Sequence, residues 1–81
     1  MREKMVDGFP NRIYRGRIVE YLRHVRPGDG VSLGRLGPAI RKSFSPRDRR
    51  WLEGLIEGLE RDSLVRVRGN GSFKTKRVEL A

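Results

Sequence analysis

The chain has 81 residues, with 19 Lys and Arg side chains against 10 Asp and Glu, a net charge of +9, and no cysteine. A domain of this size buries only about 60% of its unfolded surface, so we expect one small core. The absence of cysteine excludes disulfides, thiolate metal sites, iron–sulfur clusters and cysteine nucleophiles. No apolar run reaches the roughly 20 residues of a membrane span, and the first residues lack the apolar stretch of a signal peptide. We therefore expect a cytoplasmic protein without membrane contacts.

Residues 1–11 show no sustained hydrophobic period, which predicts a flexible tail or linker ahead of a single domain over residues 12–81. Apolar residues then recur at helical spacing over residues 14–25. We expect a first helix with Asn11 as its N-cap, ending near Arg26, because a Pro-Gly-Asp-Gly run then turns the chain.

A short edge strand at Val31 is expected before a second helical stretch that Ser32 caps. Pro38 complicates this stretch, because a proline inside a helix removes a backbone hydrogen bond and costs about 3 kcal/mol. Either the helix is kinked at Pro38, or it begins near Gly37-Pro38, where proline is tolerated. Both alternatives predict a short or broken second helix.

The third helix is the most clearly indicated element. Ser45 with Asp48 three residues later resembles a capping box, and Pro46 occupies the first helical position, where its missing N–H costs nothing. Gly54 and Gly58 lie on the face opposite the apolar residues and together cost about 2 kcal/mol relative to alanine. They reflect helix packing, sequence drift, or close approach of a phosphate backbone, another protein or the hairpin that follows.

After the third helix the period of the pattern changes to two, which predicts a hairpin. Val65 and Val67 alternate with two arginines, and Asn70-Gly71 is a favoured hairpin turn. On the return strand, Val78 and Leu80 alternate in step with Lys74 and Lys76, so a regular strand would place all four side chains on the same face. Either these lysines lie beyond the core at the hairpin tip, or a bulge switches the two faces.

This order of elements predicts an α+β fold, a small winged helix-turn-helix with three helices and a C-terminal β-hairpin wing. Tyr14 and Trp51 are expected to cover the rim of its core. The predicted core residues are Ile18, Leu22, Val25, Leu33, Leu36, Ile40, Leu52, Leu55, Ile56, Leu59, Val65 and Val67.

The basic charge is concentrated in two segments. Residues 32–50 carry six bases and one acid, and residues 65–81 carry five bases and one acid, whereas residues 51–64 carry one base and four acids. Net charges of +5 and +4 therefore flank an acidic helix body. Two basic clusters on one domain favour a polyanionic partner, because each neutralised phosphate releases counterions.

Nucleic acid, and duplex DNA first, is thus the expected partner, which would make the protein nucleoid-associated. Arg47 and Arg50 lie near a helix N-terminus, where backbone N–H groups also attract phosphate. The exposed centre of that helix lacks Asn and Gln and has glycine and glutamate instead, so we expect weak sequence specificity. The predicted DNA-binding residues are Arg41, Lys42, Arg47, Arg49, Arg50, Arg66, Arg68, Lys74, Lys76 and Arg77.

No catalytic constellation is evident. His24 is the only histidine and has no partner suited to metal binding or to general-base catalysis. The serines have no triad around them, and the glycine-rich turn at residues 69–73 lacks the Lys-Ser/Thr of a phosphate loop. We expect no enzymatic activity from this chain alone, no catalytic residues, no metal and no cofactor.

Three stretches of the chain are similar to one known family. They are Asn11-Arg-Ile-Tyr-Arg-Gly-Arg-Ile-Val-Glu-Tyr-Leu, Ser32-Leu-Gly-Arg-Leu-Gly-Pro-Ala-Ile-Arg and Trp51-Leu-Glu-Gly-Leu-Ile-Glu-Gly-Leu-Glu-Arg-Asp-Ser-Leu-Val. They resemble the winged-helix segment that follows the catalytic domain in some A/G-specific adenine glycosylases. The resemblance covers roughly residues 9–68, and its Arg-Gly-Arg-Ile portion is the most specific.

This resemblance implies an accessory domain of a base-excision repair enzyme, one that grips duplex DNA or orients the catalytic domain of a larger protein. The family's catalytic carboxylates, helix-hairpin-helix and cluster cysteines match nothing here, so none is carried over. Ser63 stands where winged helices usually have glycine.

Two other functions stay open. The acidic flank formed by Glu53, Glu57 and Glu60 favours a winged helix that docks onto another protein. A stand-alone transcription regulator usually adds a dimerisation helix, which the residues before Asn11 and after Leu80 do not supply. We therefore expect a monomer, and the chain fits either a complete protein or a fragment.

Overall fold

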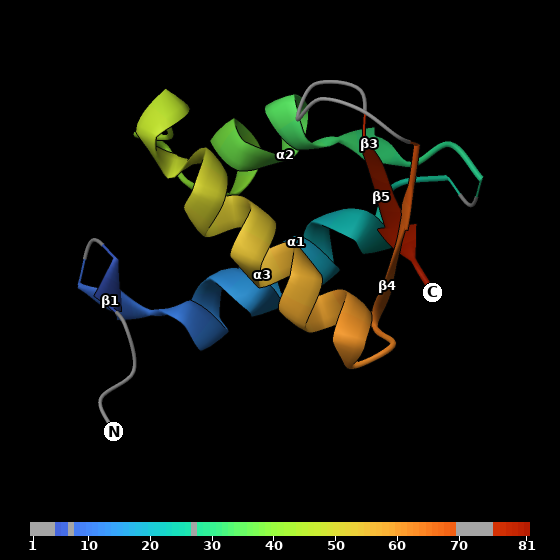
Figure 1. Ribbon diagram of the computed structural model, residues 1–81, viewed down its shortest axis with the longest axis horizontal. Helices are drawn as coiled ribbons and strands as arrows, with labels where there is room; N and C mark the ends of the chain where they lie inside the picture. The colour runs from blue at the N-terminus through green and yellow to red at the C-terminus, as the bar shows by residue number, and fades with distance from the viewer. Residues whose placement is uncertain (1–4, 7, 27, 70–75) are drawn as a thin grey trace.

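The structure is a computed structural model that describes residues 5–6, 8–26, 28–69 and 76–81. Three helices, α1 (Asn11–Arg23), α2 (Leu33–Ile40) and α3 (Arg49–Arg61), pack on a small antiparallel sheet (Figure 1). The sheet has the strand order β3-β5-β4 and consists of β3 (Val31–Ser32), β5 (Arg77–Leu80) and β4 (Val65–Arg68). This α+β arrangement is a small winged helix-turn-helix, which confirms the predicted fold class.

The segment predicted as a tail contains regular structure. Strand β1 (Met5–Val6) pairs with β2 (Phe9–Pro10) in an antiparallel ladder directly before α1. The guanidinium carbon of Arg17 lies 5.4 Å from the centre of the Phe9 ring, so α1 contacts this small hairpin.

Both predicted ends of α1 need correction. The N-cap is Pro10, and Asn11 is the first helical residue. The Asn11 Oδ1 atom accepts a hydrogen bond of 3.0 Å from the indole N–H of Trp51, so a tertiary contact uses the side chain that was predicted to cap the helix. The helix ends at Arg23, not near Arg26, because the next two N–H groups bond to carbonyls only three residues back, at 3.1 Å.

Helix α2 begins at Leu33, so a start near Pro38 is wrong. Ser32 caps it as predicted, since its Oγ atom accepts a hydrogen bond of 3.3 Å from the N–H of Arg35. Pro38 lies inside this eight-residue helix. Because proline has no N–H, the one helical hydrogen bond that position 38 would donate is missing.

The predicted capping box at the start of α3 is confirmed, but the first residues after the cap form a 3-10 turn and not an α-helix. The N–H of Ser45 donates to the Asp48 carboxylate at 2.9 Å, and Pro46 opens a 3-10 turn, η1 (Pro46–Asp48), before the α-helix proper. At the other end, the Leu64 N–H bonds to the Leu59 carbonyl at 2.9 Å, which closes the helix.

The predicted edge strand is confirmed, because Val31 pairs with Val78. In the β4–β5 hairpin, Val67 lies opposite Val78 and Arg68 opposite Arg77. Lys76 precedes the first paired residue of β5. The predicted Asn70-Gly71 turn and Lys74 lie outside the described residues.

The core differs from the prediction at four valines: Val25 and Val67 are only partly buried against it, whereas Val31 and Val78 are buried in it and were not predicted. Tyr14 was predicted at the rim but is 1% exposed, and its ring meets Trp51 edge-on with centroids 5.0 Å apart. Trp51 covers the rim as expected. The buried residues are Tyr14, Ile18, Leu22, Val31, Leu33, Leu36, Ile40, Leu52, Leu55, Ile56, Leu59, Val65 and Val78.

Candidate nucleic-acid interface

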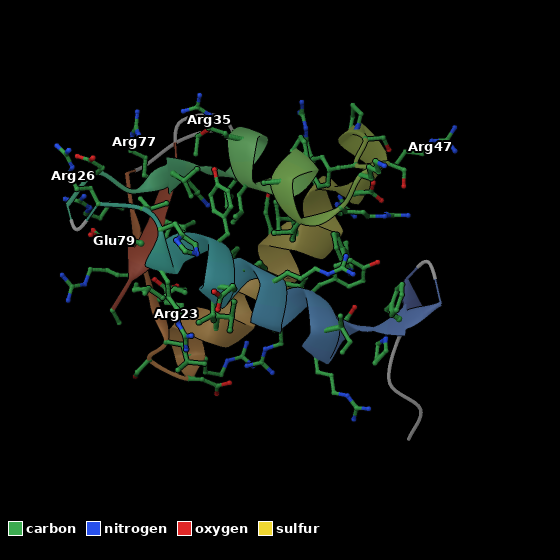
Figure 2. The ribbon with its side chains drawn as sticks, turned by 180° about the vertical axis from the view of Figure 1, so that it is seen from behind. Arg23, Arg26, Arg35, Arg47, Arg77 and Glu79 are labelled. Carbon is green, nitrogen blue, oxygen red and sulfur yellow. The ribbon has the colours of Figure 1, made fainter. Side chains whose placement is uncertain are left out.

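Three exposed arginines lie along one edge of the molecule, the upper edge in Figure 2. Arg77 is the first residue of β5, Arg35 lies in the first turn of α2, and Arg47 lies in η1. We call these three residues the basic edge. The Leu33 N–H donates to the Lys76 carbonyl at 3.4 Å, so the start of α2 lies beside the start of β5.

The basic edge follows the longest axis of the molecule, which measures 34 Å. One turn of B-DNA is about as long, roughly 34 Å. Lys42, in the connection between α2 and η1, and Arg50, in the first turn of α3, are exposed on neighbouring segments. A duplex lying along this edge could therefore meet cations from α2, η1, α3 and β5.

Two of the predicted contacts form ion pairs within the domain. Arg41 Nη1 lies 2.7 Å from Asp48 Oδ1, both side chains are only 17% exposed, and the guanidinium carbon is 5.7 Å from the Trp51 ring centre. Arg68 Nε lies 2.6 Å from Glu79 Oε1. Arg41 therefore fastens the end of α2 to η1, and Arg68 links the two strands of the hairpin.

The sheet register directs the arginines of the β4–β5 hairpin away from the helices. Val65 and Val78 are buried against the core, so their neighbours along each strand face outward. Arg66 and Arg77 are both exposed on this outer face, and Arg77 Nη1 also donates a hydrogen bond of 3.5 Å to the Asp29 carbonyl at the end of the sheet nearest α2. The structure therefore does not bring Arg66 together with Arg47 near the start of α3.

An acidic groove of about 140 Å³ separates the middle of α3 from the sheet. It is lined by Leu33, Glu53, Ile56, Glu57, Glu60, Val67 and Lys76. The three glutamates would repel the phosphate oxygens of a duplex placed here, because both carry negative charge. The middle of α3 is thus poorly suited to enter a DNA groove.

The glycines of α3 are not explained by packing inside the domain. A Cβ atom added at Gly54 or at Gly58 would meet no described atom within 4 Å. Packing of this face against another described helix or strand is therefore excluded as the reason for glycine.

Sequence reasoning missed Arg35 and Arg26 as candidate contacts. Both are exposed, and in Figure 2 they lie on either side of Arg77. The signal for Arg35 was present in the basic segment 32–50, but its proximity to Arg77 arises from strand pairing and not from sequence spacing. Arg49 is exposed and has an interaction partner of its own.

The fold places the chain in the class of small winged-helix proteins. Comparisons with protein-family models, with curated proteins and with solved structures found no match. Across the described segments, no three His, Asp or Glu side chains gather as a metal site would require. None of the helices described is both long and apolar enough to cross a membrane.

Proposed function

We propose that this winged helix binds duplex DNA along its basic edge, with weak sequence specificity, as an accessory domain of a DNA repair glycosylase. The observation that supports binding is the alignment of Arg35, Arg47 and Arg77 along one edge (Figure 2). Among the described residues, Arg35 and Arg47 have no acidic partner. An exposed arginine of this kind can bind a phosphate without first breaking an ion pair, whereas Arg41 would have to release Asp48.

Weak specificity follows from where the charges lie. Contacts to phosphates fix the position of a protein on a duplex but carry no sequence information. Base edges are recognised from within the grooves, and the side of α3 that faces the sheet presents Glu53, Glu57 and Glu60. A protein held along the basic edge therefore grips the DNA backbone without inserting the middle of α3.

The repair context is supported by the sequence resemblance to adenine glycosylase segments. In that setting the domain would hold duplex DNA while a catalytic domain elsewhere in the protein acts on the base.

Fluorescence anisotropy with a labelled duplex of about 20 base pairs tests the binding. A duplex that contacts about four cations should lose roughly 100-fold in affinity between 50 and 200 mM salt, since the slope of log K against log salt is about −0.9 per phosphate. Arg35→Ala and Arg47→Ala should each reduce the slope by about one.

Arg23→Ala is the matched control, because Arg23 is an exposed arginine of α1 far from the basic edge (Figure 2). It removes the same charge and should leave the slope nearly unchanged. Absent or salt-independent binding, or an equal effect of Arg23→Ala, would argue against the proposal. Unrelated duplex sequences should compete within about threefold, which checks the weak specificity.

A further inference from the structure

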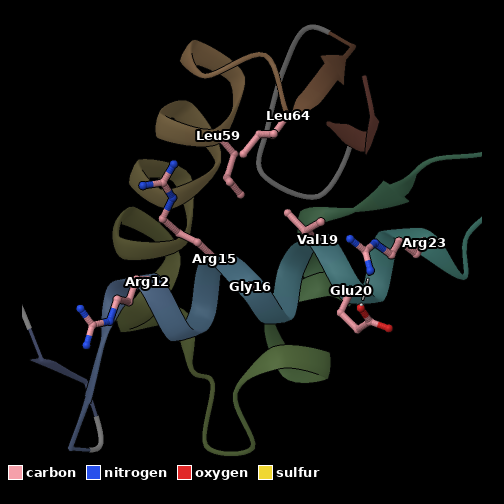
Figure 3. Close-up of a pocket in the computed structure, with 8 residues that line it drawn as sticks. All are labelled: Arg12, Arg15, Gly16, Val19, Glu20, Arg23, Leu59 and Leu64. Atoms are coloured by element: carbon pink, nitrogen blue, oxygen red, sulfur yellow. Dashed lines mark hydrogen bonds and ion pairs between the residues drawn. The ribbon is translucent and has the colours of Figure 1, made fainter.

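A second surface feature lies away from the basic edge, between α1 and the C-terminal end of α3 (Figure 3). This α1–α3 groove has a volume of about 370 Å³. It is lined by Arg12, Arg15, Gly16, Val19, Glu20, Arg23, Leu59 and Leu64. In Figure 2, Arg23 lies low on the molecule and Arg35 and Arg77 lie at the top, so the groove and the basic edge are separate surfaces.

The centre of the groove is apolar. Leu59 is buried, Val19 is half-buried and points toward the two leucines, and Leu64 is 47% exposed (Figure 3). Leu64 is held in place by the hydrogen bonds of its backbone, from its N–H to the Leu59 carbonyl at 2.9 Å and from the Ala81 N–H to its carbonyl at 3.1 Å. The backbone that carries this exposed apolar side chain is therefore fixed at both of its polar groups.

The rim of the groove carries a net charge of +1, because its three arginines face Glu20 in the lining and Asp62 beside it. Its lining contains three arginines and one glutamate. Arg23 Nη1 lies 3.2 Å from Glu20 Oε2, and Arg15 pairs with Asp62 across the groove, from α1 to the end of α3. Exposed ion pairs of this kind are weak, so carboxylates of a partner can compete for these arginines.

Gly16 keeps the side of α1 in the groove open. It lies in the middle of α1, where glycine is less favourable than alanine, and an added Cβ atom would meet no described atom within 4 Å. Packing among the described residues therefore does not require glycine at this position. A missing side chain does allow the backbone of another helix to approach α1 closely.

We propose that the α1–α3 groove binds an amphipathic helix of another protein, with its apolar face on Val19, Leu59 and Leu64 and with acidic flanks. Recognition by a helix in a groove uses apolar anchors at i, i+3, i+4 and i+7, which suits an apolar strip between two helices. The arginine rim selects glutamate and aspartate beside those anchors and repels lysine. A nucleic acid does not fit, because its phosphates would lie over the apolar centre.

A synthetic helical peptide of about four turns tests this directly, with leucines at the anchor positions and glutamates at the others. Isothermal titration with the full chain should give saturable binding with one site. A peptide with the same leucines and with lysine in place of every glutamate should bind at least about tenfold more weakly. No saturable binding of the acidic peptide, or equal binding of the lysine peptide, would overturn the proposal.

Two exposed glycines give a matched pair of variants that locates the site. Gly16→Glu places bulk and negative charge in the groove, and Gly54→Glu makes the same change on an exposed face of α3 outside it. Both changes suit helical backbone, so circular dichroism should show that both variants fold. Gly16→Glu should weaken peptide binding about tenfold or more, and Gly54→Glu should leave it unchanged.

Leu64→Gln is the second groove variant, because Leu64 is exposed and its loss spares the core. It should also weaken the peptide about tenfold. Unchanged peptide affinity in both Gly16→Glu and Leu64→Gln would overturn the proposal, since any binding that remained would then be to another surface such as the basic edge. These titrations contain no DNA, so their outcome is independent of the proposed nucleic-acid binding.

Discussion

Ser63 adopts a left-handed backbone conformation at the end of α3, with a φ of 62°. Its N–H bonds to the Glu60 carbonyl at 3.0 Å, and the next N–H bonds to the Leu59 carbonyl, which together form a complete helix C-terminal motif. Glycine adopts this conformation without the strain that a Cβ atom causes. The turn predicted from the general winged-helix pattern thus forms despite the serine.

Ser63→Gly should therefore raise the free energy of unfolding by about 1 kcal/mol, because it relieves the strain of the left-handed conformation. Urea denaturation followed by circular dichroism measures this change. Ser63→Ala is the control, since it keeps the Cβ atom and should give no gain. Equal stability of the glycine and alanine variants would contradict the assignment of strain to this residue.

Single residues also show which contacts sequence reasoning does not reach. Asn11 was expected to cap α1 and Arg41 to bind phosphate, because each has a suitable side chain at a suitable position. In the structure Pro10 is the cap and Asn11 accepts a hydrogen bond from Trp51, 40 residues away, while Arg41 has an ion-pair partner, Asp48, that the sequence did not indicate. The Trp51 partner of Asn11 is set by the packing of α3 against α1, and the Asp48 partner of Arg41 is set by the turn that joins α2 to η1; local pattern contains neither arrangement.

Among the elements, α3 was predicted best because its capping residues and its apolar face are encoded locally. The end of α1 was predicted too late, since Val25 continues the apolar pattern while the backbone has already left the α-helix. In α2, Pro38 suggested a later start, yet the Ser32 cap decides where the helix begins. Pro38 is the third residue from the end of this short helix and removes one hydrogen bond. The helix therefore still begins at the residue after the Ser32 cap.

Gly54 and Gly58 provide a test of how α3 is used. Because an added Cβ atom meets no described atom at either position, Gly54→Ala combined with Gly58→Ala should raise the free energy of unfolding by about 2 kcal/mol. DNA affinity should stay within about twofold of the original, since the proposed contacts lie on the basic edge. Thermal melts and anisotropy titrations of the double variant measure the two quantities.

A large loss of DNA affinity in this double variant would show that the backbone of α3 approaches the duplex closely. That result would support insertion of α3 into a groove in place of binding along the edge. Gly16→Ala is the control, because this exposed glycine of α1 also has no described atom near its added Cβ and lies away from the basic edge, so DNA affinity should stay unchanged.

At the scale of the whole molecule, the central position of β5 determines which charges meet. Its pairing with β3 brings Arg77 beside the first turn of α2, where Arg35 lies. The sequence predicted both the β3 strand and the β5 strand, but it did not indicate which residues would be neighbours. For that reason the two basic segments could be predicted from charge counts, whereas only the structure shows that Arg35, Arg47 and Arg77 lie along one edge.

The two proposed surfaces face in different directions, so DNA and the acidic helix should bind at the same time. The shorter dimensions of the molecule are 24 and 21 Å, well beyond the Debye length of about 8 Å at 0.15 M salt. At that salt concentration, a saturating acidic peptide should change the DNA dissociation constant by less than about twofold. At about 0.01 M salt, where the Debye length is roughly 30 Å, the peptide's carboxylates should weaken DNA binding measurably. Full competition at 0.15 M salt would instead place both ligands on one surface, because only a shared site makes binding exclusive when the charges are screened.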